Sequence, residues 1–104
     1  MRRGEVWWAR LPLPAGRRPV LLLSRDRAIQ VRQAVIVAQV TGTVRGIPTE
    51  VSLGREDGLP KPCVVNADVL LTIPKALLDG RICALSREKL AAVGQAVRFA
   101  LGLD

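Results

Sequence analysis

The chain is built from short apolar runs separated by polar turns, and few segments are long enough for a helix. Segment 19–23 is a nearly continuous apolar run, which is typical of a strand buried on both faces. In segment 49–53 apolar and polar positions alternate, which indicates a strand with one exposed face. Segment 34–40 is rich in β-branched residues, which favour strands. The pattern predicts short strands at 4–11, 19–23, 34–40, 49–53, 63–65 and 69–73.

The last element is predicted to be a helix. Ser86 can cap its start, Glu88 suits its first turn, and Gly102 suits its end. One apolar face is expected, made of Leu90, Val93, Val97 and Leu101. The connections are expected to be a polar loop at 24–33, a long turn at 54–62 and a helical turn at 74–78. Short strands followed by one helix favour a mainly β fold, a small curved antiparallel sheet or barrel with a C-terminal helix.

The amino-acid composition suits a globular domain and is strongly basic. The 104 residues suit a single domain, 1–104, and 49% of them are apolar, enough for a core. The net charge is +7, and most of the cationic residues are arginine. Codon bias in a GC-rich genome is one interpretation. The other is an anionic partner, because arginine forks bind phosphate or carboxylate bidentately.

Several classes of site are disfavoured by what the sequence lacks. It contains no histidine, the usual general base and commonest metal ligand. Cys63 and Cys83 stand alone without metal-ligand spacing and are expected to be reduced core residues. We therefore expect no metal and no cofactor. No signal peptide or membrane-length apolar run is recognisable, so a cytoplasmic protein with no membrane contact is expected.

The segment GRRPVLLLS, residues 16–24, places two arginines at the start of a buried strand. They can simply keep a loop soluble. However, Pro19 biases Arg18 towards an extended conformation, which restricts the direction of its side chain. A rigid strand end is also where an anion contact is best built. Arg18 is therefore a candidate phosphate ligand.

A second candidate lies in VAQVTGTVRG, residues 37–46, where a buried strand ends in Thr41-Gly42-Thr43 and Arg45 follows. An ordinary hydroxyl-stabilised turn explains the local pattern equally well. If this strand neighbours 19–23 in the sheet, Arg18 and Thr41 lie close together. Guanidinium, hydroxyl and backbone donors would then surround a phosphate.

Of the adjacent Trp7 and Trp8, one is expected in the core and the other on the opposite side.

Taken together, the segments resemble the MazF/PemK family of toxin endoribonucleases over nearly the whole chain. The resemblance rests on the order of RGEVWWARLP, GRRPVLLLS, VIVAQVTG, IPTEVSL, GLPKPCVVNADVLLTI and ALSREKLAAVGQAV. It implies an SH3-like barrel of the plasmid-toxin (MazF/CcdB-like) type that forms a homodimer. It also implies metal-independent cleavage of single-stranded RNA at a short sequence, leaving a 2′,3′-cyclic phosphate and a 5′-hydroxyl. A cognate antitoxin with an acidic C-terminal segment is the implied protein partner.

The resemblance assigns roles to individual residues. Arg18 and Thr41 match the catalytic arginine and threonine. RNA contacts are expected at Arg17, Ser24, Arg25, Gln39, Thr43 and Arg45. The loop 11–17 is short and contains no acid, unlike the family pattern. For the general base, Asp68, a backbone carbonyl and a phosphate-bound water all remain open. A non-catalytic barrel that binds DNA gyrase or nucleic acid is the alternative function.

Overall fold

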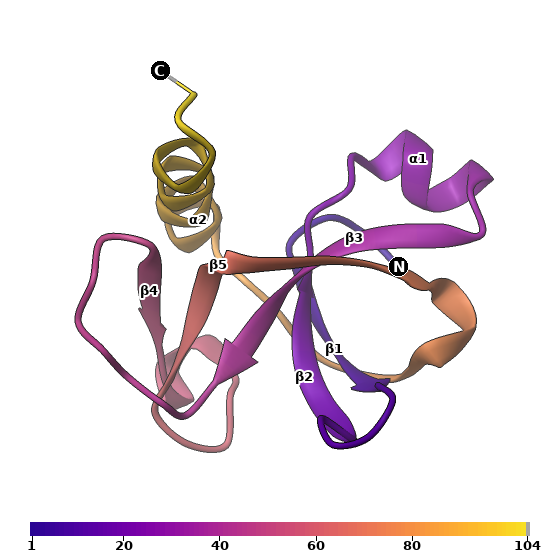
Figure 1. Cartoon of the computed structure of the whole chain (residues 1–104), viewed down its shortest axis with the longest axis horizontal. Helices are drawn as coiled ribbons and strands as arrows, with labels where there is room; N and C mark the ends of the chain where they lie inside the picture. The colour runs from indigo at the N-terminus through magenta and orange to yellow at the C-terminus, as the bar shows by residue number, and fades with distance from the viewer. Residues whose placement is uncertain (104) are drawn as a thin grey trace.

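The computed structural model describes residues 1–103, and six strands dominate it (Figure 1). The strands are β1 (Glu5–Arg10), β2 (Arg17–Leu22), β3 (Ala34–Thr41), β4 (Glu50–Leu53), β5 (Cys63–Pro74) and β6 (Leu78–Ala84). The helices are α1 (Asp26–Val31) and α2 (Arg87–Leu101), with short 3-10 turns at Arg55–Asp57 and Lys75–Leu77. The expected mainly β fold with a C-terminal helix is confirmed.

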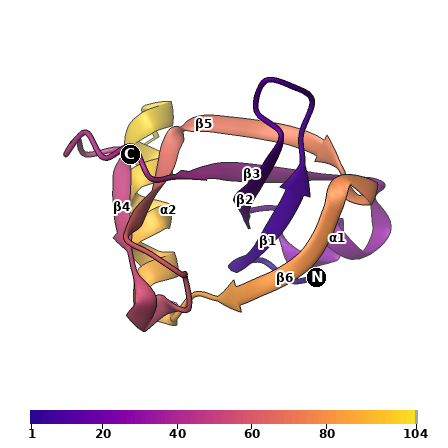
Figure 2. The same cartoon turned by 90° about the horizontal axis from the view of Figure 1, so that it is seen from below.

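All six strands form one antiparallel sheet in the order β4-β5-β3-β2-β1-β6. Strand β5 bends where its register against β3 shifts: Ala38 pairs with Leu70, but the next residue, Gln39, pairs with Asn66. Extra residues on one strand bend it and increase its twist. The sheet therefore curls into a half-barrel, with α2 packed against β4 and β5 and α1 beside β3 (Figures 1 and 2).

Strand β2 is buried on both faces, as its apolar run predicts. Val20, Leu21 and Leu22 have no exposed surface. Val20 and Leu22 belong to one core cluster, with Ala9, Ile29, Val35, Val37 and Ile73. Leu21 belongs to another, with Val6, Leu23, Ala38, Val40, Leu53, Leu59, Cys63, Val65 and Val93. The strand thus separates two packed interiors and is held from both sides.

Helix α2 starts and ends as the sequence predicts. The Ser86 hydroxyl accepts a hydrogen bond from Lys89 N at 3.1 Å, and Gly102 ends the helix with a φ of 69°. Val93 is fully buried, but Leu101 was wrongly expected on the buried face: it is 56% exposed, and Ala96 is buried instead. Leu101 instead borders an open pocket that Ile36 of β3 and Leu70 of β5 also line.

Three other expectations were wrong in detail. The polar stretch 24–33 contains α1, whose burial is limited to Ala28 and Ile29. The strands expected at 63–65 and 69–73 are one continuous strand, because the bend in β5 keeps its pairing on both sides. Strand β6 was not predicted, because polar Asp79-Gly80-Arg81 interrupts its apolar pattern.

In residues 1–103, no helix has the length and apolar character needed to cross a membrane.

Candidate functional site

A solvent-open pocket of about 300 Å³ lies where the start of β2 meets the end of β3. Four parts of the chain reach it: β1, the β1–β2 connection with β2, the end of β3, and the segment before β5. Its lining residues are Trp8, Ala15, Arg17, Arg18, Pro19, Val40, Thr41, Gly42, Leu59, Pro60, Lys61 and Cys63. The pocket therefore brings together Arg18 and Thr41, which are distant in the sequence.

Arg18 reaches the pocket from the paired part of β2. Its backbone lies opposite Ala9 in β1, and its Nε donates to the carbonyl oxygen of Ala15 at 3.0 Å. This bond fixes one edge of the guanidinium group. Within residues 1–103 the terminal Nη groups donate no hydrogen bond, so a guanidinium fork remains for an anion.

Thr41 is half-buried at the end of β3, and its hydroxyl already has one partner. Thr43 N donates to Thr41 Oγ1 at 3.2 Å. A hydroxyl has two acceptor lone pairs and one proton, so accepting this bond leaves the proton available. Thr41 can therefore donate to an anion in the pocket while the turn that follows it keeps the oxygen in place.

Arg17 lies beside the pocket but is already engaged. Its guanidinium lies 4.4 Å from the centre of the Trp8 ring, and its Nε is 3.7 Å from Asp79 Oδ2. Arg10 Nε bonds the same carboxylate oxygen at 3.1 Å. These pairs are exposed and individually weak, but together they hold Arg17 against Trp8. Trp7 packs on the Val20 side of the sheet instead, so the two tryptophans face opposite sides as expected, but Trp7 is half-buried rather than a core residue.

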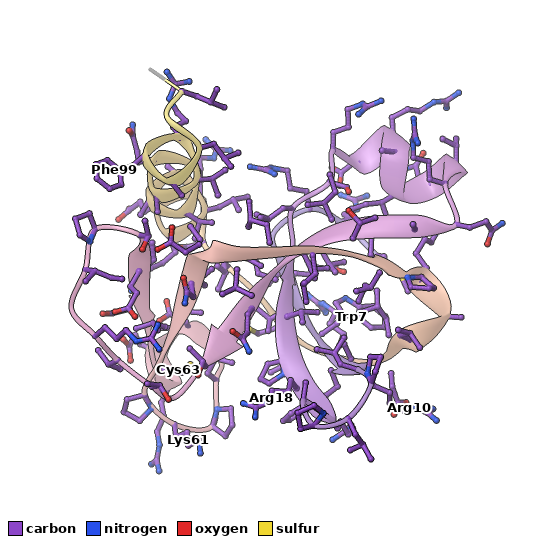
Figure 3. All side chains as sticks on the ribbon, in the orientation of Figure 1. Trp7, Arg10, Arg18, Lys61, Cys63 and Phe99 are labelled. Atoms are coloured by element: carbon purple, nitrogen blue, oxygen red, sulfur yellow. The ribbon has the colours of Figure 1, made fainter. Side chains whose placement is uncertain are left out.

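Lys61 and Cys63 complete the pocket wall. Sequence reasoning did not propose Lys61, although its position between two prolines indicates a fixed backbone. Cys63 is buried, and burial raises the pKa of its thiol, with the nearby Asp57 carboxylate adding to the effect. It is therefore a neutral wall residue. Figure 3 shows Arg18, Lys61 and Cys63 on one side of the molecule and Phe99 on the opposite side.

The other expected RNA contacts are not in this pocket. Gln39 is half-buried within β3, and Thr43 and Arg45 are exposed in the connection after it. The Glu50 carboxylate accepts from Arg45 N at 3.0 Å and from Gly46 N at 2.8 Å, which orders that connection.

Ser24 and Arg25 lie at the far end of β2, beside a separate pocket. The Ser24 hydroxyl accepts from Ile36 N at 2.8 Å. The RNA-binding roles of the residues outside the first pocket, including these two, stay predictions.

Asp68, one of the open choices for the general base, lies outside the pocket. Its carboxylate accepts a 2.6 Å hydrogen bond from the Thr49 hydroxyl, and its own N–H donates to Asn66 Oδ1. The carboxylate is thus part of the β4–β5 junction. No trio of histidine, cysteine, aspartate or glutamate side chains in residues 1–103 is arranged to hold a metal ion.

The chain is similar to known proteins over nearly its whole length. Residues 2–101 match the family described as the PemK-like, MazF-like toxin of type II toxin–antitoxin systems. The chain is 41% identical over 103 residues to the probable endoribonuclease MazF2 of Mycobacterium tuberculosis, covering 98% of this chain and 99% of the relative. It is 38% identical over 100 residues to the probable endoribonuclease MazF5 of the same organism, covering 95% and 91%.

Solved structures are similar as well. The Mycobacterium tuberculosis toxin MazF-mt6 superimposes with a TM-score of 0.89 at 36% identity, covering 96% of this chain and 98% of that one. A mycobacterial endoribonuclease in complex with its cognate antitoxin gives a TM-score of 0.89 at 30% identity, covering 100% and 97%. The matches span nearly the full length of each protein and include the β2–β3 pocket. The chain therefore belongs to the PemK-like, MazF-like toxins of type II toxin–antitoxin systems.

Proposed function

We propose that this toxin is an endoribonuclease that cleaves single-stranded RNA, messenger RNA above all, at a short sequence and so inhibits translation. The convergence of Arg18 and Thr41 on one open pocket is the observation that carries the proposal. The curated relatives carry the name endoribonuclease, which supports the same reaction class. The cleavage needs no metal and leaves a 2′,3′-cyclic phosphate and a 5′-hydroxyl.

In this reaction the 2′-oxygen of the RNA attacks the adjacent phosphorus, so the protein need not supply a nucleophile. Arg18 binds the non-bridging oxygens and stabilises the charge that develops on them. One such donor is worth about 3 kcal/mol. The Thr41 hydroxyl donates to the same phosphate and helps to orient it. Alignment of the 2′-oxygen with the leaving oxygen contributes on the order of 7 kcal/mol in favourable intramolecular cases.

The same basic surface suits the protein partner. One structural relative was solved with its cognate antitoxin. In this chain, a net charge of +7 and the cationic pocket favour an antitoxin with an acidic C-terminal segment that excludes RNA. A cytoplasmic location is part of the proposal, since messenger RNA is a cytoplasmic substrate. A homodimer of this single domain is also part of it, as the family resemblance implies.

End mapping tests the reaction directly. The purified protein is incubated with labelled single-stranded RNA in EDTA, and both product ends are determined. Discrete cuts with 2′,3′-cyclic phosphate and 5′-hydroxyl ends are expected. Binding should weaken steeply with salt, because phosphate contacts release counterions. RNA that stays intact across varied sequences would overturn the proposal and favour a non-catalytic barrel.

A further inference from the structure

Resting on the proposed ribonuclease activity, we propose that Lys61 is the general acid that protonates the 5′-oxygen as it leaves the scissile phosphate. Arg18 and Thr41 account for the charge on the phosphate but not for this proton. The leaving alkoxide is strongly basic, and its departure is slow unless a proton reaches it in the transition state.

The backbone of Lys61 is fixed although its side chain is exposed. Pro60 and Pro62 flank it, and each proline restricts its own φ and the residue before it. Leu59 and Cys63, on either side of that Pro-Lys-Pro unit, are both buried in the larger core cluster. Arg55 Nε also donates to the carbonyl oxygen of Pro60 at 3.3 Å. Lys61 therefore lines the pocket from an anchored segment, and its exposed side chain is long enough to bring the ammonium group to a phosphate bound there.

The other proton-bearing groups of the pocket are poorly suited to the step. Arg17 and Arg18 keep their protons in proteins. The Cys63 thiol is buried and its pKa is raised, chiefly by that burial. The Thr41 hydroxyl is a weak acid and is used to orient the phosphate. No carboxylate or imidazole lines the pocket in residues 1–103, so the lysine ammonium is the acid that remains.

The step balances without an additional reactant. The 2′-hydroxyl loses its proton to solvent water or to an acceptor on the RNA, and its oxygen forms a bond to phosphorus. The bond from phosphorus to O5′ breaks, its electron pair stays on O5′, and that oxygen takes a proton from Lys61 Nζ. The neutral amine then regains a proton from solvent. The products are the cyclic phosphate and a 5′-hydroxyl.

The general-acid role of Lys61 can be tested with an RNA substrate whose leaving group departs without protonation. Wild type, Lys61→Met, Lys61→Gln and Lys61→Arg are compared on ordinary RNA and on the same RNA with sulfur replacing the bridging 5′-oxygen at the cleavage site. A thiolate leaves without protonation. All three variants should cut ordinary RNA about a hundredfold or more slower and the sulfur substrate within about threefold of wild type. Lys61→Arg keeps the charge but cannot release the proton.

Arg27→Met is the matched control, because it removes one positive charge from the exposed surface of α1, outside the pocket. Its cleavage rate should stay within about twofold of wild type. Equal losses on both substrates would overturn the general-acid role and leave Lys61 as a phosphate ligand. Unchanged cleavage of ordinary RNA would overturn any role in the reaction. If the wild type itself leaves RNA intact, the proposed function fails rather than this inference.

Discussion

The two ends of the β2–β3 pair carry similar residues but form different surfaces. At one end, Arg18 lies beside Thr41; at the other, Arg25 lies beside Ser24. In both cases the hydroxyl accepts a hydrogen bond from a backbone N–H. Four parts of the chain line each pocket, but only the first pocket contains a tryptophan and a lysine. An arginine and a hydroxyl are therefore not enough to identify a site.

The pocket beside Ser24 and Arg25 has a different lining. Its volume is about 490 Å³, and it is lined by Leu23, Ala28, Ala34 and Ile36 as well as by polar residues. Ser24 has a structural role there, because its hydroxyl accepts a hydrogen bond from Ile36 N near the start of β3. We therefore assign catalysis to the Arg18 end, and paired substitutions at the two ends test that division.

The largest difference is expected between Arg18→Ala and Arg25→Ala. Loss of the Arg18 guanidinium removes the main charge stabilisation at the phosphate, so the cleavage rate should fall about a hundredfold or more. Arg25→Ala should change the rate at saturating protein by less than about threefold, because the RNA contact predicted for Arg25 would affect affinity rather than the chemical step. Single-turnover rates on labelled RNA measure both, and thermal melts confirm that both variants are folded. Equal losses for the two variants would remove the distinction between the ends.

A smaller difference is expected between the hydroxyl groups. Thr41→Val removes a donor to a charged phosphate and should slow cleavage by about tenfold or more, whereas Thr41→Ser should retain most of the rate. Ser24→Ala should leave the cleavage rate at saturating protein nearly unchanged but lower the free energy of unfolding by about 1 kcal/mol, because Ile36 N loses its partner. Denaturant unfolding measures the second effect. A cleavage defect in Ser24→Ala would contradict the division.

The smallest effect is expected from the carboxylate that engages Arg17. Asp79→Asn removes a negative charge 3.7 Å from Arg17 Nε. Affinity for an uncleavable 2′-deoxy analogue should rise about two- to fivefold at low salt, since exposed pairs are worth under about 1 kcal/mol. Asp26→Asn makes the same charge change at the far end, where Asp26 Oδ1 accepts from Arg3 N. Equal affinities for the two variants would exclude a local effect of Asp79.

Strong local patterns predicted the parts of the fold that they determine. The apolar run of β2, the β-branched β3 and the Ser86 cap of α2 each specify one element, and β2 and β3 are indeed neighbours. That pairing explains how Arg18 and Thr41 could be predicted to lie together. Strand β6 depends instead on pairing with β1, which its interrupted apolar pattern does not reveal. Lys61 was missed because its position depends on how the segment before β5 folds against β2.

The position of β2 between two interiors also determines how Arg18 meets its ligand. From Val20 onward the side chains of this strand are packed on both faces, and the carbonyl oxygen of Ala15 accepts a hydrogen bond from Arg18 Nε. Little backbone freedom remains to be lost when an anion arrives, so more of the contact energy is available for affinity. The phosphate meets a rigid receptor rather than one that it must first organise.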